Sequence, residues 1–369
     1  MHESSRQLPP RVARVVAQIG PDLSAQGGIA SVLKSYSDYR TGFEEFGYHL
    51  IFISSGGSAT SGKARKFVAA WCQLFWLALL GRVDLVHLHS SIKGSLLRKS
   101  ILALTCVVLR KKYVMHIHSG AFAQYYGALP AFIQTLVRFV MTHAACVISL
   151  SEHARSTLIA MNLATADKCR LVYNGIKDPL PSGPEARKAT PKVSITFLGK
   201  LSESKGLVTL FEALAMLSHS APAYALFVGG SGDASTLADW ISKYKLDDVV
   251  IYKGWISGDD KIQLLKDTRI FVLPSYSEGF PVAIVEAMAF GATVVSTQIP
   301  GVMDAIRPGR DGLLVQPGDV EGLSAALLRL LNDETLCCAL SATARQRFLE
   351  CFTIERSARL LASIYDEAT

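Results

Sequence analysis

Short runs of apolar residues alternate with longer helical stretches along almost the whole chain. In the first half, strands are predicted at 14–20, 49–55, 84–90, 113–119, 145–151 and 169–175. In the second half, strands are predicted at 193–199, 224–230, 248–254, 269–275 and 292–298. Apolar strands separated by helical spans of about a dozen residues or more are typical of parallel sheets covered by helices on both faces.

A proline-rich polar segment, DPLPSGPEARKATPK (178–192), separates the two series of strands, with the linker itself placed at 181–192. Because 369 residues are too many for one ordinary core, two domains are expected. The pattern predicts an α/β fold with two doubly wound Rossmann-like domains, 1–180 and 193–369, facing across a cleft that binds the ligand. The last periodic stretch, 352–368, is predicted to be a helix that packs on either domain, including back on the first.

Composition narrows the class of protein. Half of the residues are hydrophobic and 19% are charged, as in ordinary globular enzymes. Seven cysteines without C-x-x-C spacing argue against a disulfide framework or a zinc module and favour a reducing compartment. The N-terminus shows no apolar region of signal-peptide length, and no apolar run reaches the roughly 20 residues of a membrane helix. A cytoplasmic protein is therefore expected.

The longest apolar segment, FVAAWCQLFWLALLG (67–81), has two interpretations. It is either a buried core helix or a helix that contacts a bilayer surface. Lys63, Arg65 and Lys66 precede it and aromatic residues lie within it, a composition that suits a membrane interface.

Charge is distributed unevenly between the two halves. Residues 1–185 contain 20 Lys and Arg against 10 Asp and Glu, whereas residues 186–369 contain 18 against 21. A basic half indicates a polyanionic partner, and the chain shows no nucleic-acid motif. An anionic membrane surface or a phosphorylated substrate is therefore preferred, with a merely soluble basic surface as the alternative.

The segment PSYSEGFPVAIVEAMAFGATVV (274–295) carries two carboxylates, Glu278 and Glu286, in an apolar context. Pro281 favours a first helical turn and Gly291 a stop, so a helix is predicted from Pro281 to Phe290. Glu278 then lies in the preceding loop. The N–H groups of Gly279, Phe280 and the first turn are free to bind hydroxyl or phosphate oxygens.

Glu286 falls inside this helix, where an unpaired carboxylate is costly to bury. One interpretation is a structural salt bridge to a distant Lys or Arg. The other is that its partners are the hydroxyls of a ligand, because a vicinal diol such as ribose offers two donors to one carboxylate.

Two further loops suit phosphate groups. In GKLSESKG (199–206), Lys200 and Lys205 bracket a turn after a strand and suit a diphosphate, with a solvated loop as the alternative. In QGGIASVLKS (26–35), Gly27 and Gly28 let the backbone approach a ligand before a helix begins. This motif is not G-x-G-x-x-G, so a nicotinamide cofactor is disfavoured.

Two H-x-H pairs, His87/His89 and His116/His118, end neighbouring strands. Alternation places both members of a pair on one face, where four imidazoles are able to bind zinc. No carboxylate or Cys stands at ligand spacing, so a single His that donates to substrate is preferred and no metal is predicted.

Taken together, these residues resemble the retaining GT-B glycosyltransferases of family 4, bacterial enzymes that build glycolipids and polysaccharides. The most specific motif is E-x7-E, here Glu278 to Glu286. The others, in order, are GGI at 27–29, DLVHLHS at 84–90, HSG at 118–120, SEHARSTL at 151–158, YNGI at 173–176, GKLSESKG at 199–206, VGGSGD at 228–233 and DGLLVQPGD at 311–319. The resemblance covers nearly the whole chain.

The resemblance implies roles for the matching positions. Glu286 would bind the ribose of a nucleoside diphosphate sugar and Glu278 the transferred sugar, beside the backbone of Gly279 to Pro281. Lys200 and Lys205 would hold the diphosphate, although the first is usually arginine in the family and lysine lacks the bidentate fork. Gly28 would bring an N–H to the phosphate.

The resemblance also implies that His118 contacts the sugar near the reacting carbon, and that KGWIS (253–257) lies where the base sits. The implied reaction moves a hexose-type sugar from a UDP- or GDP-sugar with retention, without a cofactor and without a divalent metal, because no D-x-D motif occurs. The expected acceptor is a glycan or a polyprenyl-diphosphate-linked sugar at the inner face of the cytoplasmic membrane. A sugar-nucleotide epimerase or hydrolase of the same fold, or a non-catalytic nucleotide- or lipid-binding partner, are the alternatives.

Overall fold

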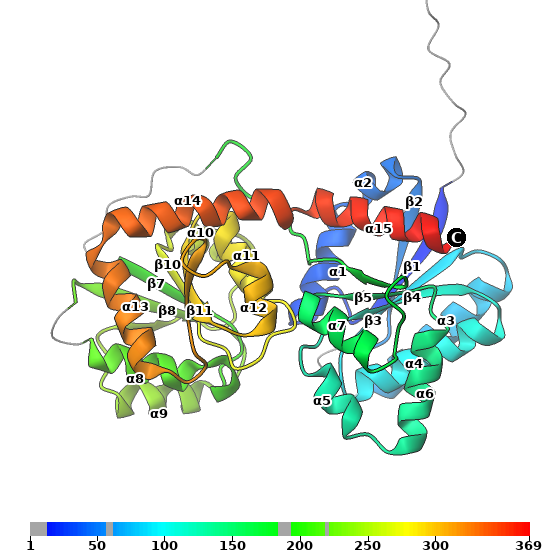
Figure 1. The fold of residues 1–369 in the computed structure, drawn as a ribbon, viewed down its shortest axis with the longest axis horizontal. Coiled ribbons are helices and arrows are strands. Elements are labelled where there is room, and N and C mark those ends of the chain that lie inside the picture. Colours follow the sequence, from blue (N-terminus) through cyan, green and yellow to red (C-terminus); the bar gives the residue numbers. More distant parts are fainter. Residues whose placement is uncertain (1–12, 57–61, 184–192, 218–220) are drawn as a thin grey trace, which may run out of the picture.

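The computed structural model describes residues 13–56, 62–183, 193–217 and 221–369 (Figure 1). Two parallel sheets of six strands each organise this part of the chain, so the predicted α/β fold with two doubly wound domains is confirmed. Most of the predicted linker, 184–192, lies outside the described residues.

The first sheet has the strand order β2-β1-β3-β4-β5-β6 and lies on the right in Figure 1. Its strands are β1 (Arg14–Gly20), β2 (Tyr48–Ser54), β3 (Leu85–Ser90), β4 (Lys112–Ile117), β5 (Cys146–Ser149) and β6 (Cys169–Leu171). Each of the six was predicted from its apolar run, because a parallel strand buried on both faces carries few polar residues. Every residue of β3 is buried, including its two histidines.

The second sheet has the order β12-β11-β10-β7-β8-β9. Its strands are β7 (Val193–Leu198), β8 (Tyr224–Gly229), β9 (Val250–Tyr252), β10 (Ile270–Leu273), β11 (Thr293–Thr297) and β12 (Gly312–Val315). The edge strand β12 was not predicted; its short apolar run is followed at once by polar residues and a proline, and three of its four residues are only partly buried.

Helices cover both faces of each sheet. The first domain contains α1 (Gly28–Asp38), α2 (Arg40–Glu45), α3 (Lys63–Leu79), α4 (Gly94–Val108), α5 (Phe122–Gly127), α6 (Ala131–Thr142) and α7 (Glu152–Ala160). The second contains η1 (Glu203–Lys205), α8 (Leu207–Met216), α9 (Ala234–Lys243), α10 (Gly258–Asp267), α11 (Val282–Ala289), α12 (Pro300–Ala305), α13 (Val320–Asn332) and α14 (Glu334–Cys351). No helix of the described residues is long and apolar enough to cross a membrane.

The last helix, α15 (Ile354–Ala368), leaves the second domain and packs on the first (Figure 1). Its apolar face joins α1, α2 and one face of the first sheet in a single core, where Leu361 and Tyr365 are fully buried. The helices α3, α4 and α6 cover the opposite face of the same sheet. The first domain is therefore completed by the end of the chain.

The chain crosses between the domains twice, and the two crossings are hydrogen-bonded to each other. The Ile176 N–H donates to the Phe352 carbonyl at 3.0 Å, and the Ile354 N–H donates to the Ile176 carbonyl at 2.9 Å. The rings of Tyr173 and Phe352 pack around Phe280 at centroid distances of 5.2 and 5.5 Å. The two crossings therefore form one hydrogen-bonded and aromatic connection between the domains.

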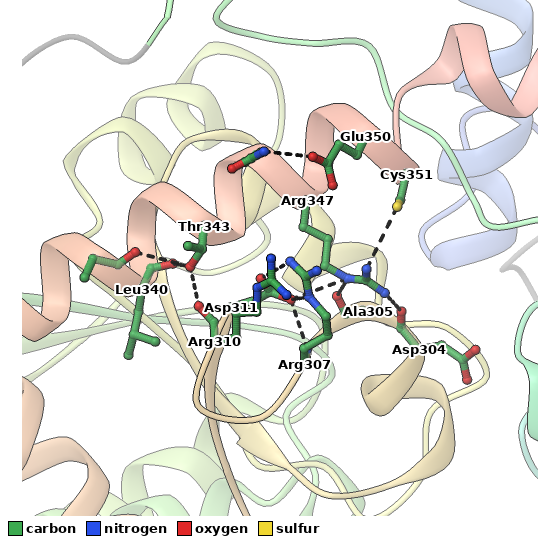
Figure 2. Close-up of polar contacts among 12 residues, drawn as sticks. Asp304, Ala305, Arg307, Arg310, Asp311, Leu340, Thr343, Arg347, Glu350 and Cys351 are labelled. Carbon is green, nitrogen blue, oxygen red and sulfur yellow. Dashed lines mark hydrogen bonds and ion pairs between the residues drawn. The ribbon is translucent and has the colours of Figure 1, made fainter.

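A buried ion cluster ties α14 to the loops of the second sheet (Figure 2). Arg307 donates two hydrogen bonds of 2.6 Å to the fully buried Asp311, and Arg347 lies 3.6 Å from the same carboxylate. Arg347 also donates to the carbonyls of Asp304 and Ala305. Because the buried Asp311 carboxylate is paired with two arginines, the cost of burying its charge is offset.

Candidate active site

The two domains touch at the loops that follow β4 and β10. A Cβ built on Gly120 would lie 2.3 Å from the Glu278 carbonyl oxygen, and one built on Gly279 would lie 2.5 Å from the His118 carbonyl oxygen. Only glycine allows this approach of backbone to backbone. The predicted site residues His118, Glu278 and Gly279 therefore come together from opposite domains.

Glu278 holds an ion pair at this junction. Its carboxylate, 10% exposed, lies 2.6 Å from the Lys205 Nζ and also accepts a hydrogen bond of 2.7 Å from the Ser275 hydroxyl. Gly206, next to Lys205, has φ +72°, and a Cβ there would lie 1.9 Å from the Pro274 carbonyl oxygen. The close packing of these loops places the Lys205 ammonium beside the carboxylate.

Helix α11 begins one residue later than predicted, at Val282, with Pro281 as the preceding cap. The prediction that the whole first turn is free to bind a ligand is wrong, because Val282 donates to the Phe280 carbonyl and Ile284 to the Pro281 carbonyl. Among the described residues, the amides of Gly279, Phe280 and Ala283 retain unengaged N–H groups. The Phe280 side chain is buried in the double crossing, so only its backbone is available.

Glu286 is not an isolated carboxylate among apolar residues. It lies on the least buried side of α11, 18% exposed, and its carboxylate is 2.7 Å from the Lys261 Nζ of α10. Of the two interpretations of this residue, the ion pair to a distant lysine is the one present in the structure. A ligand that binds Glu286 has to share the carboxylate with Lys261.

The remaining predicted site residues lie at the same edges of the sheets without contacting this junction. Gly27, with φ +129°, precedes α1, and Gly28 is its first residue. A Cβ on either glycine would meet no atom within 4 Å, so the loop has room for a ligand. Lys200 follows β7, is exposed and forms no ion pair within the described ranges.

The four histidines form a hydrogen-bonded chain on the α1 and α15 side of the first sheet. Gln18 Nε2 donates to the Tyr365 hydroxyl, so that hydroxyl donates to His87 Nδ1 at 2.7 Å. His87 Nε2 then carries the proton and donates to His116 Nδ1 at 3.1 Å. His116 is left with a buried Nε2–H that has no acceptor.

The second branch of this series of hydrogen bonds ends at His118. Since the Gln18 carbonyl accepts from His89 Nε2, His89 Nδ1 is unprotonated and accepts the proton of His118 Nε2 at 2.9 Å. Burial lowers the pKa of His118 to about 3, with a contribution from the nearby charge of Lys99. His118 is thus a neutral imidazole with its Nδ1 lone pair unprotonated.

Three of the four histidines lie close enough together to suggest a metal site. Ligand atoms of His87, His89 and His116 lie within 4.8 Å of one another. Five of their six ring nitrogens already exchange hydrogen bonds with each other, with His118, with Gln18 or with Tyr365. The arrangement fits neutral hydrogen-bonded imidazoles, and the absence of a metal requirement stays a prediction.

Three polar residues of this region were not identified from the sequence. Gln18 and Tyr365 fix the histidine tautomers, and Lys99 donates to the Ser55 hydroxyl while its side chain is almost completely buried. Gln18 and Lys99 each interrupt an apolar stretch, and that interruption is the signal available in the sequence. Tyr365 carries no such signal, because its partner His87 lies 278 positions away.

Two family models match the chain. The model for glycosyl transferases group 1 matches residues 184–347, and that for the glycosyl transferase 4-like domain matches residues 6–175. Together the two models cover nearly all of both domains.

Similar curated proteins are glycosyltransferases. An uncharacterised glycosyltransferase of Methanocaldococcus jannaschii is 26% identical over 279 residues, covering 70% of this chain and 69% of that protein. A putative colanic acid biosynthesis glycosyltransferase of Salmonella typhimurium is 30% identical over 215 residues, covering 56% of this chain and 50% of that protein. These alignments span from half to about two thirds of the relatives' own lengths.

Among solved structures, the Anabaena protein HepE in complex with UDP and glucose superposes with a TM-score of 0.75. Its sequence is 17% identical, and the match covers 96% of this chain and 99% of that one. At this identity the likeness establishes the shared two-domain fold.

Proposed function

Since the chain belongs to the GT-B glycosyltransferases of group 1, in family 4, we propose that it transfers a hexose-type sugar from a UDP- or GDP-sugar to a lipid-linked or glycan acceptor. The proposal includes retention of the anomeric configuration. The relatives named for colanic acid synthesis and the Anabaena structure with UDP and glucose support a nucleotide-sugar donor and a role in polysaccharide synthesis.

The observation that carries the proposal is the junction of His118 with Glu278. Two loops touch backbone to backbone there: one carries His118 with its neutral imidazole, and the other carries Glu278, whose carboxylate is paired with Lys205. A donor bound between the domains would present its sugar to His118 and Glu278. Lys205 would then lie beside the diphosphate.

The nucleotide is assigned to the second domain. Glu286, on the partly exposed side of α11, would accept hydrogen bonds from the ribose hydroxyls. Trp255, half exposed in the segment 253–257 between β9 and α10, would lie against the base. Gly28, at the start of α1 in the first domain, would donate its N–H to the phosphate.

In the proposed reaction, negative charge develops on the leaving diphosphate, and the groups around it would stabilise that charge. Breaking the bond between the sugar and the phosphate leaves a nucleoside diphosphate and an oxocarbenium-like sugar. Lys205, Lys200 and the unengaged amides of Gly279 and Ala283 would stabilise the leaving diphosphate. The acceptor hydroxyl would attack from the same side as the leaving group, which gives retention. We propose that neither a cofactor nor a divalent metal is required, so turnover should persist in EDTA.

The proposed acceptor is held at a membrane, and one surface supports this. The described helices α3, α4 and α6, with the residue that follows α3, expose eleven large apolar side chains: Val68, Trp71, Trp76, Leu79, Leu80, Leu97, Ile101, Leu104, Val108, Phe132 and Phe139. Between Glu45 and Glu152 the sequence contains eleven Lys and Arg and one acidic residue, Asp84. A segment with an exposed apolar surface and almost only basic charges suits an anionic lipid leaflet.

Donor turnover tests the activity. A thermal-shift screen against UDP-, GDP- and ADP-sugars identifies the base, and transfer to lipid-linked acceptors is then measured. Rapid conversion of the donor without any acceptor would instead indicate an epimerase or hydrolase. Nucleotide binding with no transfer to any acceptor pool would indicate a non-catalytic partner.

Liposome flotation tests the membrane part separately. Binding should depend on anionic lipid and should fall when Trp76 and Leu80, both more than half exposed, are replaced by serine. Flotation that is equal on neutral and anionic vesicles would contradict the proposed leaflet.

A further inference from the structure

Two cations of helix α4 lie at the carboxyl edge of the first sheet without an acidic partner. The Lys99 side chain belongs to a residue only 2% exposed, and its ammonium donates to the Ser55 hydroxyl. That hydroxyl in turn donates to the Gly20 carbonyl at 3.0 Å. Ser55 follows the end of β2 and Gly20 ends β1, so the ammonium lies at the edge of the sheet where the proposed site is located.

Arg98, the neighbouring residue, is bordered by glycine backbone. A Cβ on Gly56 would lie 3.4 Å from one terminal guanidinium nitrogen, and a Cβ on Gly94 would lie 3.2 Å from the other. The Arg98 Nε is buried and has no hydrogen-bond acceptor. Neither Arg98 nor Lys99 forms an ion pair with any other described residue.

Burying an ammonium without a counter-charge is unfavourable. Burial, together with the charge of Arg98, lowers the pKa of Lys99 to about 7. Two such cations at the edge of the sheet therefore lack a counter-charge among the described residues, and a bound anion would supply it.

This place adjoins the proposed reaction centre. A Cβ built on Gly20, whose carbonyl accepts from the Ser55 hydroxyl, would lie 3.6 Å from the His89 Cβ, and His89 is hydrogen-bonded to His118. His118 is also the residue whose backbone packs against Gly279 of the other domain. An anion bound by Lys99 would thus lie on the first-domain side of the junction, whereas Lys205 belongs to the second domain.

We propose that Lys99 and Arg98 form a binding site for a phosphoryl anion of the substrate. A phosphate or diphosphate supplies the two negative charges that these cations lack, and the guanidinium donates to such groups in a bidentate manner. The inference rests on the proposed function and deepens it by assigning a phosphate-containing acceptor to the first domain.

The outer side of the same helix favours the acceptor over the donor as the source. Leu97, Ile101, Leu104 and Val108 form an exposed apolar stripe on α4, at spacings of three and four residues. One helix therefore carries cations at the edge of the site and an apolar surface that faces away from it. This combination fits a lipid whose phosphate enters the site while its chain stays in the leaflet.

The test uses the full chain and three soluble probes: inorganic pyrophosphate, farnesyl diphosphate and UDP. Lys99→Met and Arg98→Gln should weaken binding of farnesyl diphosphate roughly tenfold or more, with UDP binding nearly unchanged. The control Lys112→Met removes the same charge at an exposed position. Lys112 begins strand β4, at the end away from the site, so this variant should change the binding of neither farnesyl diphosphate nor UDP.

A second variant identifies the source of the phosphate. Lys205→Met should weaken UDP binding and leave farnesyl diphosphate binding intact, as expected for an acceptor site separate from the donor. If Lys99→Met instead weakens UDP and pyrophosphate in parallel with Lys205→Met, the anion belongs to the donor and the acceptor assignment is overturned.

The stability of the variant separates a binding role from a structural one. Removing an uncompensated buried cation should leave the urea midpoint of Lys99→Met unchanged or raised. A lowered midpoint with unchanged affinity for all three probes would overturn the site. Neither result depends on turnover, so an absence of sugar transfer would count against the proposed function alone.

Discussion

The ammonium of Lys205 lies 2.6 Å from the carboxylate of Glu278, and the two residues come from loops 73 positions apart. Each neutralises the other. In the proposed site, a diphosphate would compete with Glu278 for the ammonium, and the sugar would compete with Lys205 for the carboxylate. Donor binding as proposed would therefore rearrange this ion pair.

Replacing Lys205 with methionine removes the charge that we propose lies beside the leaving diphosphate. We expect kcat/KM for the nucleotide sugar to fall about 100-fold or more, because a preorganised cation at the developing charge is lost. Steady-state transfer assays measure this. Lys266→Met, an exposed position in α10, is the matched control, and equal rates for the two variants would exclude Lys205 from the site.

Glu286 and Lys261 allow the two interpretations of that glutamate to be separated. If the carboxylate binds ribose, Glu286→Ala weakens UDP binding but hardly changes binding of 2′,3′-dideoxy-UDP. If it serves only the ion pair, Glu286→Ala and Lys261→Met shift the unfolding midpoint alike and leave both affinities unchanged. Calorimetric titration of both nucleotides gives the answer. We expect the first result.

Gly120→Ala should separate the domains where they now touch. The new Cβ would overlap the Glu278 carbonyl at 2.3 Å, and neither backbone is able to yield without moving a domain. We expect the rate of sugar transfer to fall at least tenfold. The radius of gyration from small-angle X-ray scattering should increase while each domain stays folded. Gly127→Ala, at the end of α5 with no atom within 4 Å, is the control. Comparable activity of both variants would show that the contact is dispensable.

Acid should destabilise the folded chain before its carboxylates titrate. Burial lowers the pKa of His87 and His118 to about 3, whereas an unfolded imidazole has a pKa near 6.5. The unfolded state therefore takes up protons first, and stability that is fully present above pH 6.5 is lost as the pH falls. Between pH 7 and 5 each buried imidazole should cost about 2 kcal/mol. Urea midpoints measure the slope, and a flat profile would mean that the folded imidazoles take up protons over the same pH range as the unfolded ones.

Tyr365→Phe interrupts the chain that fixes the histidine tautomers. The Gln18 amide and His87 Nδ1 lose their shared hydroxyl, which should lower the free energy of unfolding by about 1–3 kcal/mol. Since the histidine chain orients His118, kcat should fall while KM for the donor stays constant. In Tyr48→Phe, the lost partner is the exposed Asp366, so both effects should be small. Equal kcat values for the two variants would show that Tyr365 does not contribute to catalysis.

The fold was predictable because buried parallel strands leave a continuous apolar run in the sequence. The edge strand β12 was missed because most of it is only partly buried and its apolar run is short. Contacts between distant segments were not predictable, since nothing local to Glu286 indicates that Lys261 is its partner 25 residues earlier. Likewise the partnership of Lys99 with Ser55 depends on how α4 packs against the end of β2. Residue types suggested the site, but the pairing of its charges is a property of the tertiary structure.

The return of α15 to the first domain has a consequence for biosynthesis. Tyr365 and Leu361 complete a core whose other members, such as Val16 and Leu85, are synthesised at the beginning of the chain. During translation the first domain cannot complete this core until the second domain and α15 have been synthesised. Until then, that face of its sheet stays uncovered. The unfinished first domain therefore exposes apolar surface that chaperones bind. Removal of α15 should impair the folding of the first domain.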